Sequence, residues 1–138
     1  MKLSDFYFAS RHAAGTKMPI LLPDGSDSGE WLQVMGPDCD DSIAAAKDFI
    51  SAYRDILDRL KPLDAECREK GDWARYNTEL NSELAKLNDA LAAVVVVGWS
   101  FEEKFTKKAL VKLLKEYKGL GGAVAQHHAE SRKALSVK

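Results

Sequence analysis

Residues 22–38 read LPDGSDSGEWLQVMGPD and place a turn, a short apolar run and a helix start next to one another. The first half of this stretch is rich in Pro, Gly, Asp and Ser, the residues that supply turn geometry. Apolar runs rich in strand-compatible residues flank the turn at Met18–Leu22 and Trp31–Met35. The pattern predicts a β-hairpin over residues 18–35, with a loop longer than the tightest type.

A long helix is expected after this hairpin. Gly36-Pro37 ends the second strand, and Asp38 is a good helix N-cap. Asp40 and Asp41 fall in the first turn, where the helix dipole favours carboxylates. The helix runs to Lys61-Pro62, where proline stops it or starts the next turn. Its apolar stripe consists of Ile43, Ala46, Phe49 or Ile50, Tyr53, Ile56 or Leu57, and Leu60.

A second helix carries a near-heptad seam from Trp73 to Val94. The seam residues are Trp73, Tyr76, Leu80, Leu84, Leu87, Leu91 and Val94. Such spacing is typical of helices that pack along one another. Packing against the first helix as an antiparallel hairpin is favoured, and pairing with a second copy is the alternative. Gly98 is expected in the left-handed position that ends a helix, with Trp99 buried beside it.

Thr106 is a plausible N-cap for a third helix that Gly119 closes, and a frayed helix is expected at the C-terminus. Residues 1–17 are expected to form an irregular or weakly extended arm. The fold class is therefore predominantly α with a small N-terminal β-hairpin (α+β), a helical hairpin and C-terminal helices. The arm (1–17) precedes one domain (18–138), whose helical part spans 38–135.

Composition narrows the class of protein. The 138 residues suffice for one domain, and a net charge of -1 argues against nucleic-acid binding across the surface. Two distant cysteines indicate a reduced cytosolic protein, and no apolar run has the length of a signal peptide or a membrane span. Lysines cluster over 104–118 and aspartates over 38–58. Solvated helix faces are the favoured interpretation, and docking of these poles on each other or on copies is the alternative.

No catalytic, cofactor-binding or metal-binding residue is predicted. His127 and His128 are adjacent, so on a helix their side chains point about 100° apart and ligate one ion poorly. His12 is isolated. Asp24, Asp27 and Glu30 lack the ligand order of a calcium loop. Because phosphate-loop and nucleophile signatures are also missing, an enzyme is not expected.

Three segments together resemble the tail assembly chaperones of long, flexible-tailed bacteriophages. They are Asp24–Gln33 with Val34, then Gly36-Pro37-Asp38-Cys39-Asp40, where the family commonly has Ser at the position of Cys39, and Ala92–Phe101 followed by Phe105-Thr106 and a Leu-rich helix. The likeness spans Met18 to Leu135. It implies a non-enzymatic protein of the host cell cytoplasm that binds the tape measure protein, keeps it soluble, promotes tail-tube assembly and is absent from the mature virion. In the family, a frameshift-extended form recruits the tail tube protein.

The candidate partner-binding residues are Tyr76, Leu80, Leu84, Leu87 and Leu91, as an apolar groove for a partner helix. Intramolecular core is the favoured interpretation of each leucine, as of Trp31 and Trp99. The alternative function is a small helical regulatory or nucleic-acid-associated protein using Lys107, Lys108, Lys112 and Lys115.

Overall fold

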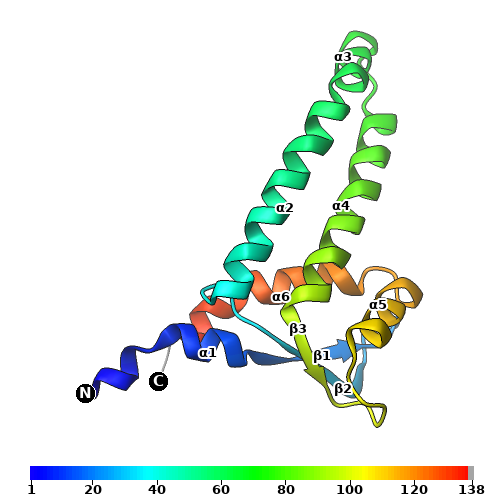
Figure 1. The fold of residues 1–138 in the computed structure, drawn as a ribbon. Coiled ribbons are helices and arrows are strands. Elements are labelled where there is room, and N and C mark those ends of the chain that lie inside the picture. The colour runs from blue at the N-terminus through cyan, green and yellow to red at the C-terminus, as the bar shows by residue number, and fades with distance from the viewer. Residues whose placement is uncertain (137–138) are drawn as a thin grey trace.

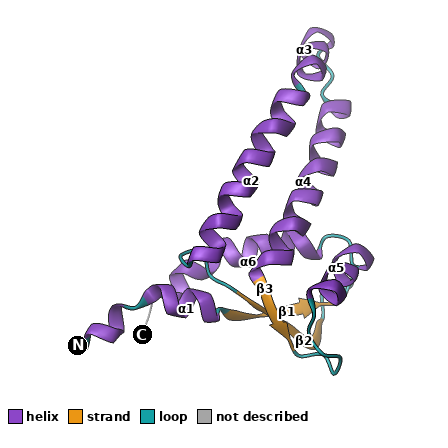
Figure 2. Ribbon diagram, in the orientation of Figure 1, coloured by secondary structure: helices purple, strands orange, loops and turns teal. Residues whose placement is uncertain are grey.

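The computed structural model describes residues 1–136. A stalk of helices stands on a base built from a small sheet and shorter helices (Figure 1). The helices are α1 (Phe8–Ala14), α2 (Asp40–Arg59), α3 (Lys61–Lys70), α4 (Ala74–Val95), α5 (Lys107–Glu116) and α6 (Leu120–Leu135), preceded by a 3-10 turn at Leu3–Phe6. The strands are β1 (Thr16–Leu21), β2 (Asp27–Val34) and β3 (Val96–Trp99). The prediction of a mostly helical protein with a small sheet is confirmed (Figure 2).

The sheet is antiparallel, in the order β1-β2-β3. β1 and β2 pair as consecutive strands, with Met18 opposite Leu32. β3 was not predicted, and the expectation for Gly98 is wrong: this glycine lies in β3 opposite Gln33 and is not among the glycines with positive φ. The β-branched residues Val96 and Val97 favour extended backbone, which gains sheet partners here.

The stalk consists of α2, α3 and α4. α2 and α4 lie side by side and run in opposite directions, with α3 at the far end (Figure 1). Pro62 occupies the first turn of α3, where its missing N–H is harmless, and Gly71 ends that helix at φ 70°. α2 begins one residue later than predicted, because Cys39 rather than Asp38 is its N-cap. The carboxylate of Asp38 is instead bound by Arg132.

The hydrophobic core lies in the base, between the sheet and α4, α5 and α6. Its most buried members, all at 0% exposure, are Leu32, Val34, Ala92, Val95, Val96, Leu110 and Val124. Thr106 caps α5 as predicted, since its hydroxyl accepts a hydrogen bond from the backbone N–H of Ala109 at 3.1 Å. Gly119, at φ 91°, turns the chain from α5 into α6.

Two expectations about the chain ends are wrong. The N-terminal segment is not irregular or extended, because it forms the 3-10 turn and α1 and buries His12 to 1% exposure. α6 is not frayed, because it buries side chains as far as Leu135. In both cases the chain end is ordered because its side chains are buried against segments that are distant in the sequence. Residues 137–138 lie outside the described part of the chain.

Candidate functional site

The five predicted partner-binding residues all lie on α4, and each is half-buried. None belongs to the set of fully buried core residues, although Leu91 packs against it. The reason is the shape of the stalk. Along its outer part α4 has α2 beside it, while the sheet and α6 lie at the base (Figure 1). Two helices bury only the facing side of each seam residue and leave the other side accessible.

An apolar groove of about 290 Å³ opens between α2 and α4 near the base of the stalk. Its lining consists of Ala45, Asp48, Phe49 and Ala52 from α2 and Leu87, Ala90, Leu91 and Val94 from α4. Small alanines on both helices leave room between the larger side chains. Asp48 is the only charged lining residue. The groove therefore offers a mostly apolar surface that a partner side chain could fill.

The predicted residues do not form one site. Leu87 and Leu91 share the groove, whereas Leu84 lines a separate hollow with Asn81, Asn88 and Lys118. Tyr76 lies near the far end of the stalk, where its ring packs edge-on against Trp73 at 5.7 Å. Sequence reasoning missed Ala45, Ala52 and Ala90. The sequence signal that could have found them is the presence of alanines at helical spacing on the facing sides of the two predicted helices.

Charged side chains on the outer stalk pair mostly with one another. Arg59 of α2 reaches Glu83 of α4 at 3.3 Å, and Glu66 binds Lys70 at 2.9 Å within α3. The hydrogen bond from Lys70 lowers the pKa of Glu66, and the same bond raises the pKa of Lys70. Exposed pairs of this kind add little stability. They keep the surface beside the apolar seam polar and hydrated.

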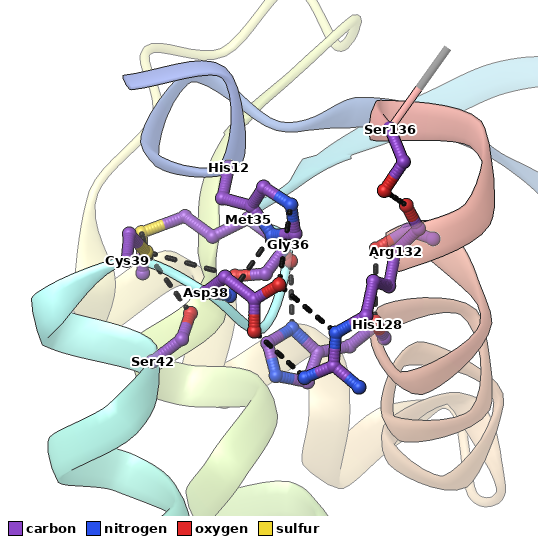
Figure 3. A network of polar contacts seen from close by, with 10 residues as sticks. His12, Met35, Gly36, Asp38, Cys39, Ser42, His128, Arg132 and Ser136 are labelled. Carbon is purple, nitrogen blue, oxygen red and sulfur yellow. Dashed lines mark hydrogen bonds and ion pairs between the residues drawn. The ribbon is translucent and has the colours of Figure 1, made fainter. Parts of the chain in front are cut away.

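A polar junction holds the linker between β2 and α2 (Figure 3). His12 of α1 accepts a hydrogen bond from the backbone N–H of Asp38 at 2.9 Å, and its own carbonyl accepts one from Gly36. From the other side, Arg132 of α6 donates two bonds to the Asp38 carboxylate. His128 of α6 lies with Nδ1 2.6 Å from the carbonyl oxygen of Met35. The junction thus ties α1 and α6 to the start of the stalk.

The hydrogen bonds assign different protons to the two buried histidines. Nδ1 of His12 accepts a bond, so its ring proton is on Nε2, 3.7 Å from the Asp38 carboxylate. Nδ1 of His128 faces a carbonyl oxygen, so that nitrogen carries a proton. His127 points elsewhere and lies 2.7 Å from the Thr16 hydroxyl, and burial lowers its pKa. His127 is half-buried and His128 is buried.

The polar contacts of the junction stabilise the fold and do not form a catalytic or metal-binding arrangement in the described residues. The nearby thiol of Cys39 is buried and donates to the Ser42 hydroxyl at 3.2 Å (Figure 3). Within residues 1–136, no cluster of three or more His, Cys, Asp or Glu side chains is placed to hold a metal ion. Both cysteines are free. The groove, and not the junction, is therefore the candidate functional site.

A model of the phage tail assembly chaperone family matches residues 43–134, about two thirds of the chain. The chain belongs to the phage tail assembly chaperones. The matched region contains nearly all of the stalk and of α6, including the groove lining. The β1–β2 part of the sequence resemblance lies outside it. No curated protein and no solved structure matches the chain significantly.

Membership of this family assigns the protein a general role in phage tail assembly. The family is one of assembly chaperones and not of enzymes, and its members act with proteins of the phage tail. Within the described residues, no helix of the chaperone is long and apolar enough to cross a membrane. The stalk of the chaperone leaves the seam residues of α4 half-buried.

Proposed function

We propose that this chaperone binds the tape measure protein of the phage tail, keeps it soluble and promotes assembly of tail-tube subunits around it. It acts without catalysis, in the host cell cytoplasm, and leaves before the virion is mature. Support comes from membership of the tail assembly chaperone family and from the exposed apolar surface of the stalk.

The groove between α2 and α4 carries this proposal. Phe49 and Leu91 are half-buried in its walls, and Val94 is 42% exposed at its end. Ridges of side chains on two helices form a furrow that a third amphipathic helix fills with residues spaced three and four apart. The free energy gained from the hydrophobic effect is roughly proportional to the apolar area removed from water. A long apolar partner therefore gains most binding free energy from such contacts. We propose Leu87 and Leu91 as contact residues, with Tyr76, Leu80 and Leu84 extending the seam.

The resemblance implies one further partner, and the near-heptad seam of α4 allows self-association. We propose that the tail tube protein is recruited through a frameshift-extended form of the chaperone, as in the family. Pairing of two copies through the stalk is the second arrangement that would cover the same seam. Size-exclusion chromatography with light scattering distinguishes it, because a self-paired chaperone elutes as a dimer or larger species without any partner.

Co-expression tests the proposed function. The tape measure protein encoded beside this chaperone is produced with and without it, and soluble yield and co-purification are measured. The proposal expects more soluble tape measure protein and recovery of both proteins in one pull-down. An unchanged soluble yield together with no co-purification would contradict it.

One observation favours a second candidate, a nucleic-acid-associated protein. The lysines of α5 and its flanks make no ion pair within residues 1–136. Lys107 is unsuited to phosphate, however, because its ammonium donates to the carbonyl oxygens of Val94 and Val96 at 3.2 and 2.7 Å. The salt dependence of the binding affinity distinguishes the two candidates. Binding to phosphate weakens steeply with added salt, whereas binding of an apolar helix does not.

A further inference from the structure

α5 and Lys104, which precedes it, carry a positive surface without ion-pair partners among residues 1–136. We define the lysine face as Lys104, Lys108, Val111, Lys112 and Lys115. All four of its lysines are exposed, and none lies within ion-pair distance of a carboxylate in the described part of the chain. On the stalk, by contrast, Lys61, Lys70 and Lys86 each have a carboxylate partner within 3.5 Å. Single lysines elsewhere, such as Lys47 on α2 and Lys133 on α6, also make no ion pair in the described residues, but the lysine face gathers four of them on one short helix and the residues before it.

The lysine face is held rigidly next to the groove. Lys107 extends from the first turn of α5 to the carbonyl oxygens at the end of α4, and its ammonium also lies 5.6 Å from the centre of the Phe105 ring. Burial lowers the pKa of Lys107, and the charge of Asp41 opposes this effect. Because Val94 contributes both one of these carbonyls and part of the groove wall, the two surfaces adjoin.

The mixture of groups on the face indicates the kind of partner. Val111 is 39% exposed between the lysines, one helical turn from Lys107 and from Lys115. An exposed valine surrounded by ammonium groups matches a partner with apolar and acidic side chains on one side. A helix of ten residues is about 15 Å long, which suits a few turns of such a segment.

The surroundings disfavour a long polyanion. Glu102 and Glu103 precede the face, Glu116 follows it, and Asp41 acts on Lys107 from α2. Along one strand the phosphates lie about 3.4 Å apart, so six to ten contacted phosphates span roughly 20–34 Å, more than the roughly 15 Å of α5. A nucleic acid would meet these carboxylates, whereas a short acidic segment stays within the lysines.

We propose that the lysine face docks an acidic amphipathic helix of a protein partner, with glutamate or aspartate against Lys108, Lys112 and Lys115 and an apolar side chain against Val111. This contact is separate from the groove and goes beyond the proposed function, since it does not require that the partner be the tape measure protein. It gives the chaperone a charge-selective second contact, which adds specificity and association rate more than affinity.

Fluorescence anisotropy with three labelled probes tests the proposal. The first is a 20-residue helical peptide with leucine at positions three and four apart and glutamate on both sides of them. The second replaces every glutamate by lysine, and the third is a 20-nucleotide single-stranded DNA. The protein variants are K108Q/K112Q/K115Q, its charge-preserving match K108R/K112R/K115R, and K61Q/K70Q/K86Q, which removes three paired lysines from the stalk.

The acidic peptide should bind the parent protein, and the lysine peptide and the DNA should bind more weakly. The lysine-to-glutamine variant of the face should lose roughly tenfold in affinity, since three exposed ion pairs, each weak, are removed together. The arginine variant and the stalk variant should bind like the parent. Amide shifts in NMR spectra should centre on residues 104–115.

Three results would overturn the proposal. The first is equal binding of the acidic and lysine peptides. The second is either an unchanged affinity of K108Q/K112Q/K115Q for the acidic peptide or the absence of binding of the parent protein to every probe. The third is tighter binding of the DNA through the same lysines, which would assign the face to nucleic acid.

Discussion

Arg132 on α6 donates two hydrogen bonds, 2.9 and 2.7 Å long, to the carboxylate of Asp38, which lies 94 positions earlier in the chain. The pair connects the C-terminal helix to the linker from which the stalk starts. His12 holds the same linker from the opposite side (Figure 3). Both ends of the chain therefore fix the direction in which the stalk leaves the base.

Asp38→Asn tests this link through pH. The hydrogen bonds from Arg132 hold the pKa of the Asp38 carboxyl below its ordinary value of 3.8, so the folded state binds a proton there less readily than the unfolded chain. The stabilisation is present above that value and is lost as pH falls through the lower pKa of the folded state. At pH 7 the variant should have a lower urea midpoint than the parent, and the difference should shrink below pH 3.8. Asp55→Asn, on an exposed site of α2, serves as control. A constant difference across this range would contradict the assignment.

His12→Ala should destabilise the fold more than any exposed substitution in α1. The side chain is 1% exposed, and its loss leaves the backbone N–H of Asp38 without its acceptor. The loss of this part-buried hydrogen bond and the cavity left by the buried ring should together cost about 1–3 kcal/mol in the free energy of unfolding. Denaturation of His12→Ala beside the exposed-site control Ser10→Ala measures this. Equal midpoints for the two variants would show that the junction is not formed in solution.

Two adjacent glycines give a matched pair at the crossing of α6 with α4. A Cβ on Gly121 would collide with the Asp89 side chain, whereas a Cβ on Gly122 would meet only the Asn88 amide nitrogen at 3.7 Å. Gly121→Ala should lower the free energy of unfolding by roughly 1–3 kcal/mol through overpacking. Gly122→Ala should be neutral or stabilise the helix by up to about 1 kcal/mol. Thermal melts that rank the two variants in the opposite order would show that the helices do not cross here.

Trp99→Ala separates a structural from a recognition role. The ring packs edge-on against Phe101 and Phe105 at 5.4 and 5.0 Å, and its N–H donates to the carbonyl oxygen of Glu103. Because the side chain is half-buried, its removal should cost roughly 3 kcal/mol, at the lower end for a large aromatic. A variant as stable as the parent that no longer binds the tape measure protein would make Trp99 a recognition residue instead.

Local signals in the sequence predicted local structure. Thr106 was recognisable as a cap because its partner N–H lies three residues away. The heptad spacing located the seam of α4, since a helical period shows which residues share a face. It does not show what covers that face, so the separation of Leu84 from Leu87 and Leu91 required the positions of α2 and α6.

Long-range partners explain what the sequence did not show. His12 appeared isolated because the backbone N–H that donates to it lies 26 positions away, and the carbonyl oxygen that His128 contacts lies 93 positions away. Gly98 satisfied the local rule for a helix end, yet pairing with β2 extended it into a strand. In each case a tertiary contact outweighs a local preference.

Ala90→Glu and Ala85→Glu test whether the tape measure protein binds in the groove. Both alanines are exposed on α4; Ala90 lines the groove with Leu87 and Leu91, whereas Ala85 lines the separate hollow with Leu84. A glutamate at either position should leave the fold intact, as matched thermal melts would show, because neither methyl group is buried. Co-purification with the tape measure protein is the measurement. Ala90→Glu should lose the partner and Ala85→Glu should retain it; retention by both variants, or equal loss from both, would contradict binding in the groove.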